Sequence, residues 1–98
     1  MRFDWDETKD ANNLLKHGVG FEAASLVFDD PLQLSAQDRE VDGEERWQTI
    51  GMAGGVLLLL VAHTFEDEDG EEVVRILSAG RSPVWANAQE RRRYEDGI

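Results

Sequence analysis

Two apolar segments in the second half of the chain, residues 56–64 and 73–79, constrain the fold most strongly. The first is a run of Val and Leu that follows Gly54-Gly55. It is too short to cross a bilayer and is typical of a strand buried on both faces. An acidic stretch, residues 65–72, separates it from the second segment, which alternates more. This arrangement predicts the central hairpin of a sheet. Because an isolated hairpin is at best marginally stable in water, the rest of the chain must extend or cover it.

The length of 98 residues predicts a single domain over residues 1–98, with a core large enough to fold without staples. The chain has no cysteine, which excludes disulfides and thiolate metal sites. Its N-terminus lacks an apolar stretch of signal-peptide length, and no run reaches the roughly 18 apolar residues of a membrane helix. We therefore expect a cytoplasmic protein that does not contact a membrane.

The formal net charge is −11, from 21 acidic and 10 basic residues, which weighs against a surface that attracts nucleic acid everywhere. The acids are concentrated in residues 38–45 and 66–72. Half of the bases lie in the last quarter of the chain: Arg75, Arg81, Arg91, Arg92 and Arg93. This distribution allows a local basic face on an acidic body, and the acidic body suits a basic partner protein.

The clearest helix signal covers Glu7 to His17, with Asp6 as the N-cap and Gly18 beyond the C-terminus. Its apolar residues, Ala11, Leu14 and Leu15, are expected to face the core. The remaining predicted elements are a strand at 2–5, a helix at 21–28, strands at about 31–37 and 45–51, the hairpin, and a helix from Ser82 to about Asp96.

The resulting order, β-α-α-β-β-β-β-α, favours an α+β fold in which an antiparallel sheet is packed by the N-terminal helices and a C-terminal helix. The expected core residues are large and apolar: Phe3, Trp5, Leu14, Phe21, Val27, Phe28, Leu58, Leu60, Ile76 and Trp85.

A set of short motifs in this order resembles the BrnT family of type II toxins. They are Phe3-Asp4-Trp5-Asp6, Asn13, Lys16-His17-Gly18-Val19, Phe21-Glu22, Ala24, Val27-Phe28-Asp29-Asp30-Pro31, Gly43-Glu44, Arg46, Ile50-Gly51, Val61, His63-Thr64, Arg75-Ile76, Ser78-Ala79, Glu90-Arg91 and Tyr94. No single motif is specific, but the collinear set is. The resemblance implies a RelE-like fold and a ribonuclease that arrests translation. It also implies neutralisation by a BrnA antitoxin, which itself binds operator DNA.

The chain departs from the family pattern at one position. Family members usually read Arg-Ile-Ile-Ser-Ala-Arg, whereas here Ala79 is followed by Gly80-Arg81. In a strand, a shift of one residue reverses the face that a side chain takes. Arg81 can therefore replace the family arginine only if Gly80 forms a bulge or the strand has already ended.

Metal-independent RNA cleavage needs a proton acceptor, a cation near the phosphate and a proton donor. The expected catalytic residues supply these groups: Arg81, Arg75, Glu90, Tyr94 and His63. The expected RNA-binding residues are Arg91, Arg92, Lys16 and His17. Since His63 and Arg81 are predicted to lie a strand's length apart, the favoured site combines Arg81 with the last helix, with or without Arg75.

Several of these residues also have a structural interpretation. His63 at a strand end is more often a hydrogen-bonded structural residue, and Arg75 inside a strand favours an ion pair with Glu44 or another acid across the sheet. Lys16 and His17 suit the negative end of the helix dipole. Glu44 and Arg46 are expected to form a salt link on one face.

The sequence predicts no metal site and no cofactor, because its two histidines and scattered acids lack ligand spacing. The expected partners are RNA and a BrnA-like antitoxin, with operator DNA reached only through the antitoxin. The alternative function is a catalytically inactive, BrnT-like protein-binding module, which the Gly80-Arg81 departure and the acidic charge both favour.

Overall fold

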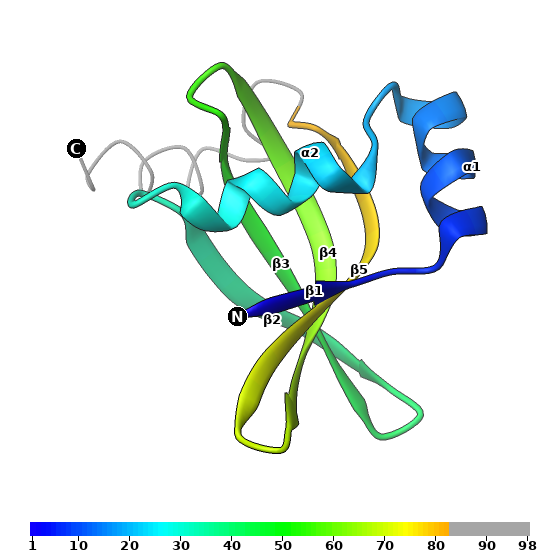
Figure 1. Cartoon of the computed structure of the whole chain (residues 1–98), viewed down its shortest axis with the longest axis vertical. Helices are drawn as coiled ribbons and strands as arrows, with labels where there is room; N and C mark the ends of the chain where they lie inside the picture. The colour runs from blue at the N-terminus through cyan, green and yellow to red at the C-terminus, as the bar shows by residue number, and fades with distance from the viewer. Residues whose placement is uncertain (83–98) are drawn as a thin grey trace.

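A computed structural model describes residues 1–82 of the chain (Figure 1). Its elements are, in order, β1 (Arg2–Asp4), α1 (Glu7–His17), α2 (Phe21–Ser25), the 3-10 helix η1 (Leu26–Asp29), β2 (Leu34–Val41), β3 (Glu44–Ala53), β4 (Leu57–Glu68) and β5 (Glu71–Arg81). The α+β class is confirmed. The predicted C-terminal helix beyond Ser82, which includes Trp85, lies outside the described residues.

The five strands form one sheet in the order β1-β5-β4-β3-β2. The pairs β2–β3, β3–β4 and β4–β5 are antiparallel, as expected for successive hairpins. The prediction of a purely antiparallel sheet is wrong, because β1 pairs with β5 in parallel. After β1 the chain forms the helices and enters the sheet again at β2, on the edge opposite β1. The successive hairpins then lead back to β5, which pairs with β1 without a tight turn between them.

The predicted caps of α1 are present. The Asp6 carboxylate accepts a hydrogen bond from the Lys9 backbone N–H at 3.0 Å, and Gly18 takes a left-handed conformation with φ of 70°. The Asp10 carboxylate accepts from the Phe21 backbone N–H at 2.7 Å and so ties α1 to the start of α2.

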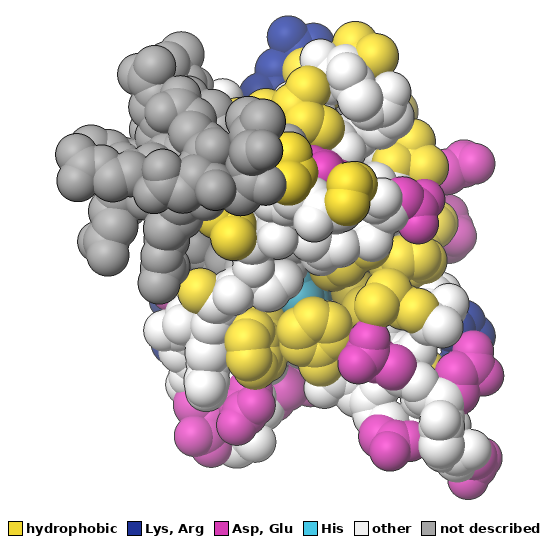
Figure 2. Space-filling model, turned by 90° about the vertical axis from the view of Figure 1, so that its left-hand side faces the viewer, with side chains coloured by type: hydrophobic (Ala, Val, Ile, Leu, Met, Phe, Trp, Pro, Cys, Tyr) yellow, Lys and Arg dark blue, Asp and Glu magenta, His cyan; other side chains and the backbone are white. Residues whose placement is uncertain are grey.

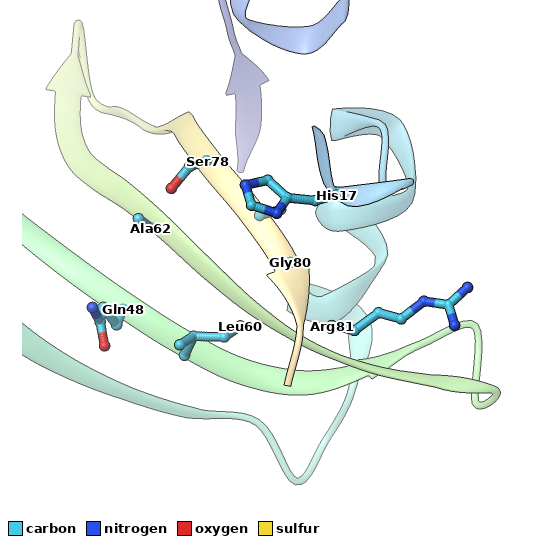
Figure 3. A pocket seen from close by; sticks show the side chains of 8 residues that line it. His17, Gln48, Leu60, Ala62, Ser78, Gly80 and Arg81 are labelled. Atoms are coloured by element: carbon cyan, nitrogen blue, oxygen red, sulfur yellow. The ribbon is translucent and has the colours of Figure 1, made fainter. Parts of the chain in front are cut away.

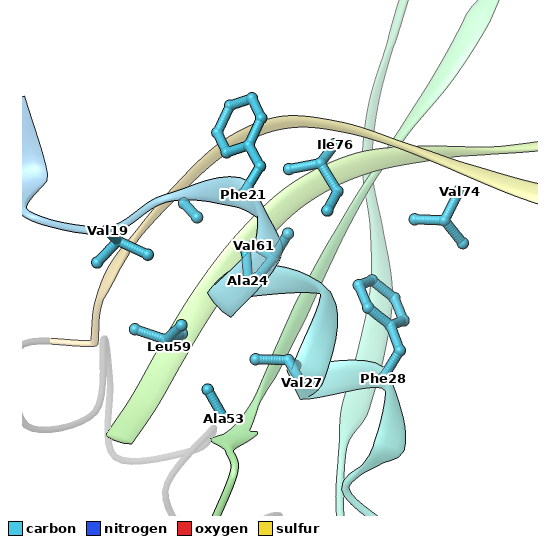
Figure 4. Close-up of a cluster of buried hydrophobic side chains, with 11 residues drawn as sticks. Val19, Phe21, Ala24, Val27, Phe28, Ala53, Leu59, Val61, Val74 and Ile76 are labelled. Carbon is cyan, nitrogen blue, oxygen red and sulfur yellow. The ribbon is translucent and has the colours of Figure 1, made fainter. Parts of the chain in front are cut away.

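The core lies between the helices and one face of the sheet (Figure 4). The connection between α1 and α2 contributes Val19, and the helices contribute Phe21, Ala24, Val27 and Phe28. The sheet contributes Ala53, Leu59, Val61, Val74, Ile76 and Ala79. We call this the inner face of the sheet. Phe3 and Trp5 are half-buried and pack against the core.

Three expected core residues lie elsewhere. Leu58 and Leu60 are half-buried and lie on the outer face, because neighbouring residues in a strand alternate and the inner positions belong to Leu59 and Val61. Leu14 is 54% exposed and Leu15 86% exposed. The residue that α1 buries is Asn13.

The hairpins β2–β3 and β4–β5 extend from one end of the molecule (Figure 1), and their turns carry much of its acidic charge. Figure 2 shows acidic side chains gathered near this end of the molecule and hydrophobic side chains across the middle of the surface that faces the viewer. The predicted salt link is present, with Arg46 Nε 3.3 Å from Glu44 Oε1. None of the helices in residues 1–82 is long and apolar enough to cross a membrane.

Candidate functional site

The end of β5 sets the geometry of the candidate site. Leu60 pairs with Gly80 and Ala62 with Ser78, whereas His63 pairs with Ile76. Leu77 is therefore an extra residue that forms a bulge. After the bulge the strand alternates regularly, so that Ser78 and Gly80 lie on the outer face while Ala79 and Arg81 lie on the inner face.

The bulge thus lies three residues before Gly80, and β5 continues to Arg81. Neither condition that would bring Arg81 to the position of the family arginine is met. Gly80 holds the outer-face position directly after Ala79, and Arg81 pairs with the core residue Leu59 on the opposite face.

A pocket of about 230 Å³ lies at this end of the sheet (Figure 3). Its lining comes from three strands and the last turn of α1: His17, Gln48, Leu60, Ala62, Ser78, Ala79, Gly80 and Arg81. The floor consists of Leu60, Ala62 and Gly80, which carry no polar side-chain atom. Gln48 and Ser78 add an amide and a hydroxyl, and His17 adds an imidazole from α1.

The Asn13 side chain connects two parts of the pocket, α1 and the end of β5. Its amide nitrogen donates to the carbonyl oxygens of Val19 at 2.8 Å and Ala79 at 2.7 Å, and its amide oxygen accepts from the Ala79 N–H at 3.2 Å. The side chain is only 6% exposed. It therefore links the end of α1, which carries His17, to the backbone next to Gly80.

Of the predicted site residues, Arg81 and His17 are brought to the same pocket. In Figure 3 the Arg81 guanidinium extends away from His17, Gln48 and Ser78. Lys16 is exposed on the last turn of α1, next to His17 in the chain. The sequence thus named two residues that line this pocket, Arg81 and His17, but it did not predict the face that each side chain takes.

Arg75 lies apart from this pocket. It is six residues before Arg81 in the strand, a separation of roughly 20 Å. Its guanidinium is 3.6 Å from the Asp4 carboxylate across the β1–β5 pair. The prediction of an ion pair with an acid across the sheet is confirmed, with Asp4 as the partner. Arg75 and Lys9 line a different hollow, together with Asp4 and Asp6.

His63 is fully buried on the inner face, whereas the pocket lies on the outer face. Its ring lies between Phe28 and Phe65, with ring centroids 4.9 and 4.8 Å away. Burial lowers the pKa of His63 from 6.5 to about 4, and a hydrogen bond with the Thr64 backbone opposes that shift in part.

Hydrogen bonds fix the tautomer of His63. Nδ1 lies 3.3 Å from the Thr64 carbonyl oxygen, which can only accept, so Nδ1 carries the proton. Nε2 then accepts from the Thr49 hydroxyl at 2.6 Å, and Thr49 in turn accepts from the Ser35 hydroxyl at 2.6 Å. These contacts describe a neutral histidine built into the core.

The other predicted site residues, Glu90, Tyr94, Arg91 and Arg92, lie outside the described residues. Within residues 1–82, no three His, Asp or Glu side chains come together as metal ligands would. Sequence reasoning did not name six of the pocket residues as site residues: Gln48, Leu60, Ala62, Ser78, Ala79 and Gly80. Alternation predicts the face each takes within its own strand, but only the register between strands brings Gln48, Leu60 and Ala62 beside Ser78 and Gly80.

Comparison with known proteins identifies relatives of the chain. Residues 5–83 match the family described as "Ribonuclease toxin, BrnT, of type II toxin-antitoxin system". The 1.1 Å crystal structure of the Brucella abortus ribonuclease toxin BrnT matches with a TM-score of 0.56 and 22% sequence identity, over 83% of this chain and 95% of that one. At this identity the likeness shows a shared fold. No curated protein sequence matches the chain.

Proposed function

The chain belongs to the BrnT family of ribonuclease toxins of type II toxin–antitoxin systems, and we propose that it is itself a metal-independent endoribonuclease that arrests translation. A BrnA-type antitoxin neutralises it and carries the complex to operator DNA. Residues 1–98 act as one toxin domain in the cytoplasm, with RNA as the substrate. A RelE-like arrangement of the fold remains a prediction of the family resemblance.

The observation that supports cleavage is the pocket at the end of β5, where an exposed imidazole and an arginine occur together. RNA can be cleaved by its own 2′-hydroxyl when a nearby group accepts that proton and a cation stabilises the phosphorane charge. We assign proton transfer to His17, because His63 is fully buried in the core. We assign the phosphate contact to Arg81, which is exposed at the strand end.

The remaining roles are proposals for residues around this site. Glu90 or Tyr94 supplies the proton for the leaving 5′-oxygen. Lys16, Arg91 and Arg92 contact the RNA backbone, where each cation adds a favourable and salt-dependent interaction. Arg75 and His63 are given structural roles, as the Asp4 ion pair and the Thr49 hydrogen bond support.

One observation favours the alternative, an inactive protein-binding module. Gly80 lies on the outer face, and Arg81, on the inner face, extends away from the other polar groups of the pocket. If the phosphate must lie on the outer face beside Ser78, Arg81, the arginine among the described residues that line the pocket, does not support it there. The protein would then keep the antitoxin-binding surface of the family without its chemistry.

Inducible expression of the full chain in a bacterial host separates the two functions. We expect growth arrest and RNA fragmentation with the wild type, relief of both by Arg81→Ala or His17→Ala, and suppression by the coexpressed antitoxin. Arg39→Ala is the matched control, since Arg39 is exposed on β2 and lies outside the pocket. Normal growth with soluble, folded wild-type protein would support the inactive module instead.

A further inference from the structure

We propose that the outer-face pocket at the end of β5 is a binding site for one nucleobase of the RNA, with Gly80 as the residue that keeps it open. This inference rests on the proposed ribonuclease function, and it names the part of the substrate that the pocket takes. Four features of the pocket carry it: its floor, the space above Gly80, its rim and its charge.

The floor suits the flat face of a base. Leu60, Ala62 and Gly80 lie side by side on two paired strands, with Leu60 opposite Gly80. They provide an apolar surface of small and medium side chains, with no group that must remain hydrated. A nucleobase has an apolar face and a polar edge, so it can cover this floor without burying an unpaired polar group.

Gly80 places no side chain in the space above the floor. A Cβ built at Gly80 would meet no atom of residues 1–82 within 4 Å, so packing among these residues does not require a glycine there. Gly80 is part of a regular strand in which a larger residue would normally be favoured. Any larger side chain at this position would occupy the pocket, and the glycine therefore sets its depth.

The rim supplies groups that read a base edge. The Gln48 amide nitrogen donates to Asp38 Oδ2 at 3.5 Å, which leaves its second N–H and its oxygen for a base. The Ser78 hydroxyl offers one donor and two acceptor positions. Both residues line the pocket, from β3 and β5 respectively. The His17 imidazole comes from α1 on the other side of β5 (Figure 3), where its ring can stack on a base or contact the adjoining ribose.

Charge argues for a base over a phosphate. Among the described residues that line the pocket, Arg81 is the fixed cation, and its guanidinium extends away from Gln48 and Ser78. A phosphate on the apolar floor would be desolvated without a counter-charge, at a large cost in free energy. The phosphate is therefore expected at the strand end, near Arg81, while the base lies on the outer face.

The test measures nucleotide binding to the full-length protein by NMR, independently of cleavage. The probes are AMP, GMP, CMP and UMP, with ribose 5-phosphate as the control for phosphate-driven binding. We expect at least one nucleotide to shift the Gly80 backbone amide and the Gln48 side-chain amide in a saturable way. Ribose 5-phosphate should leave both signals unchanged. The absence of any saturable shift with all four nucleotides would overturn the proposal.

Two variants locate the site. Gly80→Val should weaken nucleotide binding by at least roughly tenfold, because it removes the surface on which the base stacks. It should leave the melting temperature within a few degrees, since a Cβ at Gly80 meets no atom of residues 1–82 within 4 Å. Gln37→Val is the matched control, because Gln37 is exposed and pairs with Trp47 on the opposite face of the sheet. Equal binding by Gly80→Val and Gln37→Val would overturn the proposal.

A third variant tests the rim. Gln48→Leu should reduce the differences in affinity among the four nucleotides, and an unchanged ranking would contradict edge reading by Gln48. The binding data also separate this inference from the proposed function. Nucleotide binding without RNA cleavage would contradict the proposed ribonuclease function and support the base site. RNA cleavage that Gly80→Val leaves unaffected would support the ribonuclease function and contradict the base site.

Discussion

At the scale of single residues, we expect Asn13 to contribute strongly to the free energy of unfolding. Its three hydrogen bonds all go to backbone groups, one at Val19 and two at Ala79. Asn13→Ala would leave two carbonyl oxygens and one N–H without this partner in a buried setting. We expect a loss of about 2–4 kcal/mol in the free energy of unfolding.

Urea unfolding measures this loss, and the same helix offers a matched control. Asn12 is exposed, so Asn12→Ala removes the same side chain without breaking buried hydrogen bonds. That variant should stay within about 0.5 kcal/mol of the wild type. Equal stabilities for the Asn13→Ala and Asn12→Ala proteins would show that the α1–β5 link contributes nothing.

His63 makes stability depend on pH. Its pKa in the folded protein is about 4, below the ordinary value of 6.5, because the buried ring resists taking up a proton. Between these values the unfolded chain binds more protons than the folded one. The contribution is therefore complete above pH 6.5 and is lost as the pH falls toward 4. The full effect is about 3 kcal/mol.

Urea unfolding from pH 7.5 to pH 4.5 tests this prediction, with His63→Gln as the reference. The 21 acidic residues titrate in both proteins, so the difference between the two curves isolates the histidine. We expect the wild type to lose stability relative to the variant as the pH falls below about 6.5. Parallel curves would mean that His63 is not a neutral core residue.

At the scale of elements, the contact between β3 and η1 depends on a glycine. A Cβ at Gly51 would lie 2.9 Å from Val27 Cγ1 and 3.3 Å from the Val27 carbonyl oxygen. Gly51→Ala should therefore push the two elements apart and cost about 1–3 kcal/mol. Gly80→Ala is the control in another strand of the same sheet, because a Cβ there meets no atom of the described part of the chain within 4 Å. Thermal unfolding of both variants measures the difference, and equal melting temperatures would contradict this packing.

Local chemistry made several elements predictable from the sequence. Asp6 and Gly18 mark the ends of α1 because capping is local, and the Glu7–His17 bounds agree with the prediction. It was harder to predict which face of a strand or helix is buried. The apolar run of β4 has no alternation that distinguishes Leu58 from Leu59, so only tertiary packing decides which one is buried. In α1, three backbone hydrogen bonds turn Asn13 inward and leave Leu14 and Leu15 exposed.

The candidate site was predictable only in part, for the same reason. Arg81 and His17 were identified as site candidates, and they line one pocket. The bulge at Leu77 and the pairing of Leu60 with Gly80 determine which other residues lie in that pocket. A bulge and a register depend on contacts between strands far apart in the sequence, which no local pattern encodes.

At the scale of the whole molecule, the acidic β4–β5 turn lies far from the pocket. The length of β5, roughly 33 Å along the strand, separates this turn from Arg81. The net charge of −11 still opposes the approach of RNA at low salt, where screening is weak.

Neutralising three of the chain's carboxylates tests that effect. Asp69→Asn, Glu72→Gln and Glu45→Gln together change the net charge from −11 to −8, because three acids become neutral amides. We expect a higher kcat/KM for RNA cleavage at about 10 mM ionic strength, and no difference at about 150 mM, where the screening length is about 8 Å. An equal gain at both salt concentrations would point to a direct role of these residues.

The central claim, an RNA-cleaving site at the end of β5, is tested most directly by cleavage of a defined RNA by the purified chain in EDTA. The comparison is between Arg81→Ala and Arg75→Ala, which remove the same charge from the same strand and differ in that only Arg81 lines the pocket. We predict that the wild type and Arg75→Ala cleave at similar rates, while Arg81→Ala is slower by at least roughly a hundredfold. Cleavage that Arg81→Ala leaves intact, or that Arg75→Ala abolishes, would contradict the claim.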